Sequence, residues 1–181
     1  MRKFMAGLVV ILVPLFFYAD VVVDGFEGAK TDWKAAAFIG GSSGMEETME
    51  DTILVENSSK EAKTGNKSLR IEYTQNPAKE NKFAQIAAPS SEKVMGDNKA
   101  VSFYAKGENA KTVIAVRLFD RSWKKWSSQE ITIDNKGWRK ISLKSEDLTG
   151  DAKGKWAVIA KMQIIVKGSC VLYIDDVKYV Q

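Results

Sequence analysis

The stretch Thr112-Val-Ile-Ala-Val-Arg-Leu-Phe-Asp120 decides the fold class, because its side chains change character at every second position. One face of this stretch is apolar, and the opposite face includes Arg117 and Phe119. The apolar face consists of Ile114, Val116 and Leu118. A period of two is the pattern of a β-strand with one buried face. The stretch therefore predicts a strand whose sheet covers a core.

The same alternation recurs along most of the chain. It occurs in Ser68–Tyr73, Ala100–Lys106, Glu130–Asp134, Lys161–Lys167 and Val171–Val180. Glycine turns such as Gly65-Asn66 and Lys167-Gly168 separate the segments, as short strands require. Only Ser145–Leu148 and Met45–Asp51 are predicted to form single helical turns. We therefore predict a single all-β domain, an antiparallel β-sandwich or barrel.

One stretch departs from this rhythm. The residues Gly40-Gly-Ser-Ser-Gly44 are followed by the acidic run Glu46–Asp51. Glycine and serine favour irregular structure, so we predict a flexible surface loop here, with a strand resuming at Thr52–Glu56.

The first residues predict export from the cytoplasm. Arg2 and Lys3 precede an apolar run from Phe4 to Tyr18, and the small residue Ala19 follows. This is the order of a secretory signal peptide, and the run is shorter than the roughly 20 residues of a membrane-spanning helix. We predict a signal peptide at residues 1–19, a domain at residues 20–181, and a secreted, periplasmic or cell-surface location. The alternative is an uncleaved N-terminal anchor.

Composition excludes several classes of function. The sequence contains no histidine, which excludes Ser-His-Asp and Cys-His catalysis and histidine-ligated zinc. Its single cysteine, Cys170, lies in an apolar strand pattern and is predicted to be a buried small hydrophobe. The net charge is +4, and lysines alternate with acids rather than forming a basic block. This pattern argues against nucleic acid and against membrane insertion of the domain.

Five motifs in sequence order resemble those of the jelly-roll carbohydrate-binding modules of bacteria, in the galactose-binding-like superfamily. The motifs are Asp24-Gly-Phe-Glu-Gly28 with Trp33 downstream, Gly65-Asn-Lys-Ser-Leu-Arg-Ile71, Val101-Ser-Phe-Tyr-Ala-Lys-Gly107, Gly137-Trp-Arg-Lys-Ile141 and Tyr173-Ile-Asp-Asp-Val177. The resemblance implies a jelly roll, whose first and last strands lie side by side, and a non-catalytic role.

The resemblance also implies a structural calcium ion that joins the two ends of the chain. Glu27 and Asp175 match the side-chain ligands of these modules, and a carbonyl near Asn66 or Lys67 matches the backbone ligand. Oxygen ligands of this kind suit calcium. The alternative is that these acids are ordinary surface or turn groups.

Aromatic and polar side chains supply the candidate ligand-binding residues. Trp123 and Trp126 lie in a polar segment and are predicted to form a contact surface, since a core role explains them less easily. The alternative is that they fold back over the sandwich edge. A second set is predicted to line the concave sheet, although a solvated sheet face has the same pattern. This set contains Tyr104, Arg117, Phe119 and Gln163. Trp33 and Trp138 are assigned to the core, and Trp156 is compatible with either the core or the surface.

These observations favour a carbohydrate-binding module with a polysaccharide or oligosaccharide ligand. The superfamily also includes domains of spirochaete flagellar sheath proteins. The alternative function is therefore a structural envelope protein, such as a flagellar sheath or surface-layer subunit, with protein partners in the envelope.

Overall fold

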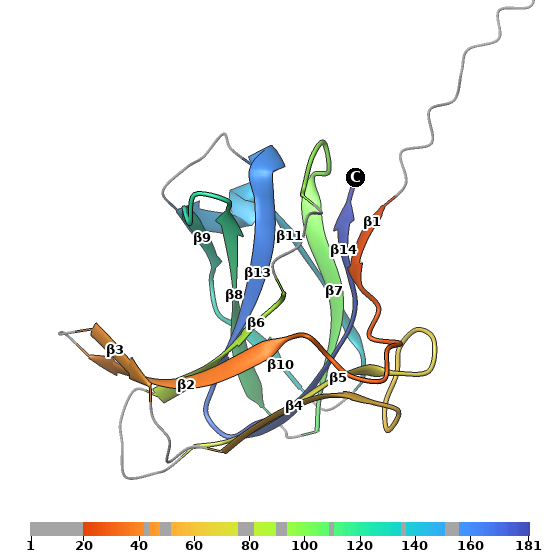
Figure 1. Cartoon of the computed structure of the whole chain (residues 1–181), viewed down its shortest axis with the longest axis vertical. Coiled ribbons are helices and arrows are strands. Elements are labelled where there is room, and N and C mark those ends of the chain that lie inside the picture. The colour runs from red at the N-terminus through yellow and green to blue at the C-terminus, as the bar shows by residue number, and fades with distance from the viewer. Residues whose placement is uncertain are drawn as a thin grey trace, which may run out of the picture.

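The computed structural model describes residues 20–41, 44–47, 52–75, 82–89, 94–108, 111–134, 137–150 and 156–181. In this part of the chain nearly all regular structure is β, arranged as two antiparallel sheets that face each other (Figure 1). The predicted all-β antiparallel sandwich is therefore confirmed. The signal peptide predicted at residues 1–19 lies outside the described residues and stays a prediction.

The first sheet, called sheet A, has the order β11-β7-β14-β5-β4, and β1 also pairs with β14. Its strands are β1 (Val21–Asp24), β4 (Thr52–Ser58), β5 (Ser68–Thr74), β7 (Ala100–Gly107), β11 (Arg139–Lys144) and β14 (Cys170–Val180). The strand at the C-terminal end of the sequence is thus central to this sheet.

The second sheet, called sheet B, has the order β12-β9-β8-β13-β6-β2-β3, and β10 also pairs with β8. Its strands are β2 (Lys34–Gly41), β3 (Gly44–Glu47), β6 (Lys82–Ala87), β8 (Thr112–Asp120), β9 (Lys125–Ser128), β10 (Ile131–Ile133), β12 (Leu148–Gly150) and β13 (Ile159–Lys167). Two short 3₁₀ turns, η1 (Ser145–Asp147) and η2 (Trp156–Val158), complete the regular structure. Figure 1 shows β3 at the far left of the molecule, while β2 runs from there past β4 of sheet A.

The core lies between the sheets and follows the predicted alternation. Sheet B contributes Ile114, Val116 and Leu118 from β8, and all three are fully buried. Across from them, Ile71 and Phe103 are fully buried on sheet A. Burial of such side chains contributes about 1.5–3 kcal/mol each to folding. The alternation read from the sequence therefore assigns the buried face of these strands correctly.

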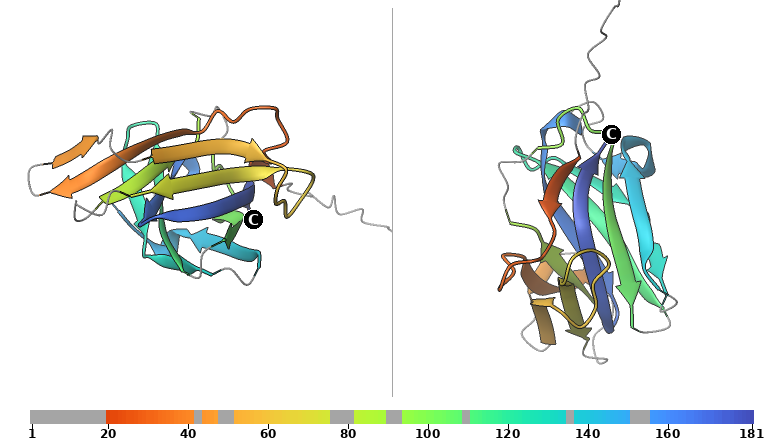
Figure 2. Two further views of the ribbon diagram at one scale, coloured as in Figure 1. Left: turned by 90° about the horizontal axis from the view of Figure 1, so that it is seen from below. Right: turned by 90° about the vertical axis from the view of Figure 1, so that its right-hand side faces the viewer.

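The two ends of the described chain lie side by side, as the resemblance implied. Val21 pairs with Tyr179, and Asp24 pairs with Val177, in an antiparallel β1–β14 ladder (Figure 2, right). Asp24 then anchors the chain beyond β1, because it accepts hydrogen bonds from the Phe26 N–H and the Trp33 indole N–H. Trp33 is 3% exposed, which confirms its assignment to the core.

Three local predictions are wrong. The segment Gly40–Gly44 is not simply a loop, because β2 runs to Gly41 and β3 begins at Gly44. The helical turn predicted from Met45 is replaced at its start by β3, which pairs with β2, and residues 48–51 lie outside the described part. Trp138 is half-buried just before β11 and is not part of the core. Backbone pairing across the sheet overrides the local glycine and acid signals.

Cys170 is buried on β14, as predicted, and burial raises the pKa of its thiol to about 12. A thiol with this pKa is protonated at neutral pH and is a weak nucleophile. The described part of the chain contains no helix with the length and apolar character needed to cross a bilayer.

Candidate functional site

The outward side of sheet B, called the outer face, gathers most of the predicted binding residues. On β8, Arg117 and Phe119 point away from the core and are half-buried. The neighbouring strand β13 places Gln163 directly opposite Arg117, and Lys161 opposite Phe119. Residues opposite one another in a ladder share a face of the sheet. The fold therefore brings Arg117, Phe119 and Gln163 together, as the sequence predicted.

The centre of the outer face contains polar groups without described partners. Gln163 is 6% exposed, and its side-chain oxygen is buried without a hydrogen bond. The Arg117 guanidinium carbon lies 5.7 Å from the centre of the Phe83 ring. Loss of solvent lowers the pKa of Arg117. A buried polar group is normally hydrogen-bonded, so these two side chains have unused capacity for a ligand.

An exposed aromatic ring stands at one end of the outer face. Trp123 is 64% exposed and lies in the turn between β8 and β9. Its ring meets Phe119 edge to face, with 5.9 Å between the ring centres. The Lys161 ammonium lies 4.4 Å from the centre of the Trp123 ring. Phe119 and Lys161 thus hold the indole at the end of the Arg117–Gln163 pair.

Asp120 builds the turn that presents Trp123. Its carboxylate accepts hydrogen bonds from the N–H groups of Ser122 and Lys124, and its carbonyl accepts one from the Trp123 N–H. Trp123 has a φ of 63°, in the left-handed region that bulky side chains rarely adopt. The surrounding hydrogen bonds stabilise this conformation, and strained residues of this kind concentrate at functional sites.

The outer face therefore combines a flat exposed ring, a planar cation and an amide. Sugar rings present C–H groups that pack on aromatic faces, while their hydroxyls accept and donate hydrogen bonds. The spacing of these groups along two neighbouring strands suits an extended polar ligand better than a small apolar one.

Two of the predicted binding residues lie elsewhere. Trp126 is 1% exposed and pairs across the ladder with Leu118, so it points into the core rather than to a contact surface. Tyr104 belongs to β7 of sheet A, where it pairs with Asp175 and lies 5.3 Å from the Lys63 ammonium. Alternation within a strand gives the direction of each side chain, but it does not say to which sheet the strand belongs.

Solved structures share this fold at low sequence identity. A family 11 carbohydrate-binding module from Clostridium thermocellum, in complex with a β-1,3-1,4-mixed-linked tetrasaccharide, gives a TM-score of 0.64 at 14% identity, over 89% of this chain and 95% of that one. The family 11 module of the cellulosomal cellulase Lic26A-Cel5E of the same bacterium gives a TM-score of 0.62 at 13% identity, over 90% of this chain and 94% of that one. The CBM22-1 xylan-binding domain of Paenibacillus barcinonensis Xyn10C gives a TM-score of 0.53 at 13% identity, over 88% of this chain and 94% of that one.

The chain has the jelly-roll fold of these modules. The predicted resemblance is thereby confirmed at the level of the fold. By sequence, no family model and no curated protein matches the chain. The order of the five short motifs was therefore the informative signal, since overall sequence similarity is too low to carry it.

The predicted calcium ligands gather around the loop between β4 and β5. The Glu27 carboxylate accepts hydrogen bonds from the N–H groups of Asn66 and Lys67. Asp175 is fully buried and accepts hydrogen bonds from the Lys63 N–H and from the N–H and hydroxyl of Thr64. One loop thus links the start of the domain to β14.

Carboxylate oxygens are the ligands that a hard cation prefers, although it is the N–H groups of Asn66 and Lys67 that contact Glu27. Glu27 Oε2 accepts one hydrogen bond of 3.2 Å, and Asp175 Oδ1 accepts one, from a hydroxyl that can rotate. Each of these oxygens has the capacity to accept a further bond. Within the described residues, no three acidic, cysteine or histidine side chains come together as a metal site. Calcium bound here would take its remaining ligands from backbone carbonyls and water.

Sequence reasoning missed the contribution of β6 to the outer face. Phe83, Gln85 and Ala87 face outward on this strand, while Ala84 and Ile86 are fully buried. The alternation of buried and outward residues in β6 could have revealed this strand. The pattern is weak, because the segment contains only one large aliphatic residue. Lys161 was also missed, although its position next to Gln163 follows from the alternation of β13.

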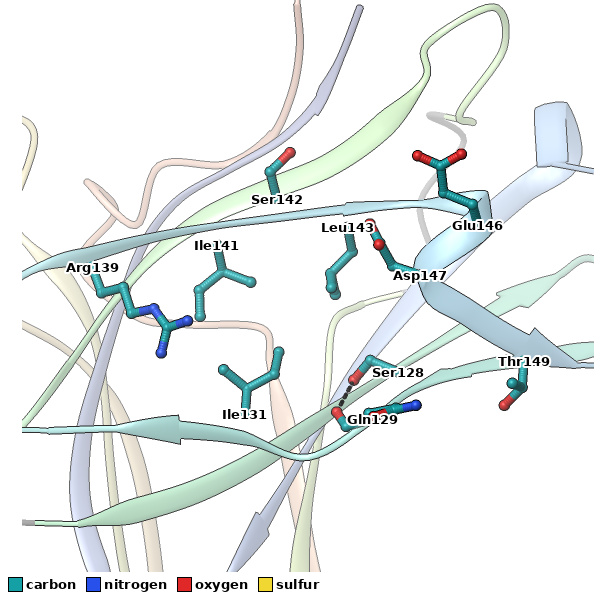
Figure 3. A pocket seen from close by; sticks show the side chains of 10 residues that line it. All are labelled: Ser128, Gln129, Ile131, Arg139, Ile141, Ser142, Leu143, Glu146, Asp147 and Thr149. Carbon is teal, nitrogen blue, oxygen red and sulfur yellow. Dashed lines mark hydrogen bonds between the residues drawn. The ribbon is translucent and has the colours of Figure 1, made fainter.

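A separate cavity of about 480 Å³ opens at the edge of the sandwich (Figure 3). Ile131, Ile141 and Leu143 form its apolar floor, between β10 and β11. Its polar rim consists of Ser128, Gln129, Arg139, Ser142, Glu146, Asp147 and Thr149. None of the residues predicted to bind a ligand lines this cavity.

Proposed function

We propose that this protein is an exported, non-catalytic domain that binds a polysaccharide or oligosaccharide on the outer face of sheet B. The observation that carries the proposal is Trp123, an indole 64% exposed yet fixed by its turn and its neighbours. Arg117 and Gln163 add hydrogen-bonding groups beside it. The modules with this fold support the proposal, because one was solved with a tetrasaccharide and another is described as xylan-binding.

Replacing Trp123 by alanine is expected to weaken saccharide binding about tenfold, which corresponds to about 1.4 kcal/mol of lost stacking. Affinity gel electrophoresis over a panel of soluble polysaccharides measures the effect. Tyr104→Ala is the matched control, because this aromatic residue lies on sheet A and should leave the mobility shift unchanged. Equal retardation of wild type and Trp123→Ala would contradict the proposed site. Unretarded wild type that self-associates in sedimentation would favour the structural envelope subunit.

We also propose that calcium binds Glu27 and Asp175 and stabilises the domain. A ligand that binds only the folded state adds about 2.7 kcal/mol at a concentration one hundred times its dissociation constant. The melting temperature is therefore expected to rise by roughly 5–10 °C with calcium and to fall back with a chelator. Scanning calorimetry measures this shift. Asp175→Asn should lose most of the response, and a melting temperature insensitive to calcium in the wild type would exclude the ion.

A further inference from the structure

We propose that the saccharide bound on the outer face is acidic, with anionic groups attached to its sugar rings. This inference rests on the proposed function and deepens it. The charges of the outer face and the positions of its cations Arg117 and Lys161 support it.

The central strands of the outer face carry only basic charge. The outward positions of β6, β8, β9 and β13 contain no aspartate or glutamate. The same positions carry Arg117, Lys125, Lys161 and Lys167. Of these, Lys167 forms an ion pair with Glu130. The three others have no acidic partner among the described residues, so these four strands present a positive field to a ligand.

Arg117 is the strongest single indication. Its side chain is half-buried between Phe83 and Gln163, where solvent is partly excluded. A charge removed from water is normally compensated by a partner of opposite sign. The guanidinium group is planar and offers parallel N–H donors that match a carboxylate or a sulfate. An anionic group on the ligand would supply the partner that the described chain does not.

Lys161 places a second cation where the sugar would stack. Its ammonium lies 4.4 Å from the centre of the exposed Trp123 ring. A neutral sugar that stacked on this side would displace the ammonium and lose the cation–π contact. An acidic sugar would displace the ammonium as well, but its anionic group would pair with the displaced ammonium and replace the lost contact. The arrangement therefore favours an acidic ring over a neutral one.

The test compares three polysaccharides and a single-stranded oligonucleotide by isothermal titration calorimetry with the purified protein. We expect polygalacturonate or dextran sulfate to bind at least tenfold more tightly than a neutral mixed-linkage β-glucan at 50 mM NaCl. The affinity should fall about tenfold at 500 mM NaCl, because salt screens the ion pairs. Binding to polygalacturonate assigns a carboxylate as the anionic group, and binding to dextran sulfate alone assigns an ester sulfate.

Two variants locate the binding charge. Lys161→Gln and Arg117→Gln are each expected to reduce affinity for the acidic polysaccharide at least fivefold. Lys140→Gln, an exposed change on β11 of sheet A, should leave it unchanged and controls for net charge. Lys161 is half-buried and lies on the outer face. The Lys161→Gln variant therefore tests the inference alone if Arg117→Gln does not fold.

The outcomes separate this inference from the proposed function. Salt-independent binding of neutral glucan, equal to that of the acidic polymers, would overturn the inference and leave saccharide binding intact. Tighter binding of a single-stranded oligonucleotide than of any polysaccharide would overturn it in favour of a phosphate backbone. Absence of binding to every polysaccharide would overturn both proposals.

Discussion

Replacing Trp126 by alanine is expected to lower the free energy of unfolding by about 3–5 kcal/mol. The indole is 1% exposed and packs in the core from β9, opposite Leu118 of β8. Truncation removes its contacts and leaves a cavity that the two sheets cannot fill by a small shift. Urea unfolding followed by circular dichroism measures the loss.

The matched control is Trp123→Ala, in the turn that leads into the same strand. This indole is 64% exposed, so its removal is expected to change the free energy of unfolding by less than about 0.5 kcal/mol. The two variants therefore separate a core role from a surface role. Similar losses in both, or a larger loss at Trp123, would show that β9 does not have the described register.

Replacing Asp175 by alanine is expected to lower the free energy of unfolding by about 3 kcal/mol in the presence of chelator. The carboxylate is fully buried, and two N–H groups and a hydroxyl from Lys63 and Thr64 donate to it. Alanine leaves these donors without an acceptor, and each unsatisfied donor costs about 1–3 kcal/mol. Part of that cost is relieved when the loop moves into water. Chelator removes any contribution of a metal ion from the measurement.

Asp175→Asn is the control for the hydrogen bonds. Its amide oxygen is able to accept from both N–H groups, and its NH₂ group is able to donate to the Thr64 hydroxyl. We therefore expect a loss of about 1 kcal/mol for asparagine, since only the charge is removed. Hydrogen exchange of the Lys63 and Thr64 amides should accelerate strongly in Asp175→Ala. Equal stability of wild type and Asp175→Ala would show that the loop does not depend on this carboxylate.

The fold was predictable because its main signal is local. Alternation along Thr112–Asp120 assigned every core residue of β8 correctly, and it placed Arg117 and Phe119 on the opposite face. The pairing of the first and last strands came from the order of motifs in the resemblance, and β1 and β14 pair as implied. Hydrophobic burial acts on each strand separately, which explains why a single sequence reveals it.

The site was only partly predictable because it depends on long-range pairing. Tyr104 and Gln163 both point away from the core, yet β7 and β13 belong to different sheets. The error at Trp126 has another cause. A tight turn held by Asp120 sets the phase of β9, and this phase turns Trp126 inward while Trp123 stays exposed. Such a phase depends on turn geometry that composition does not encode.

The central place of β14 also fixes the order in which the molecule is completed. This strand of 11 residues pairs with β1, β5 and β7, so sheet A lacks its middle until residues 170–180 arrive. Pairings between segments so distant in the sequence form slowly, because the intervening chain must first be ordered. A polypeptide emerging N-terminus first therefore stays open until its last strand is delivered. Such a delay would keep the chain unfolded during the export proposed above.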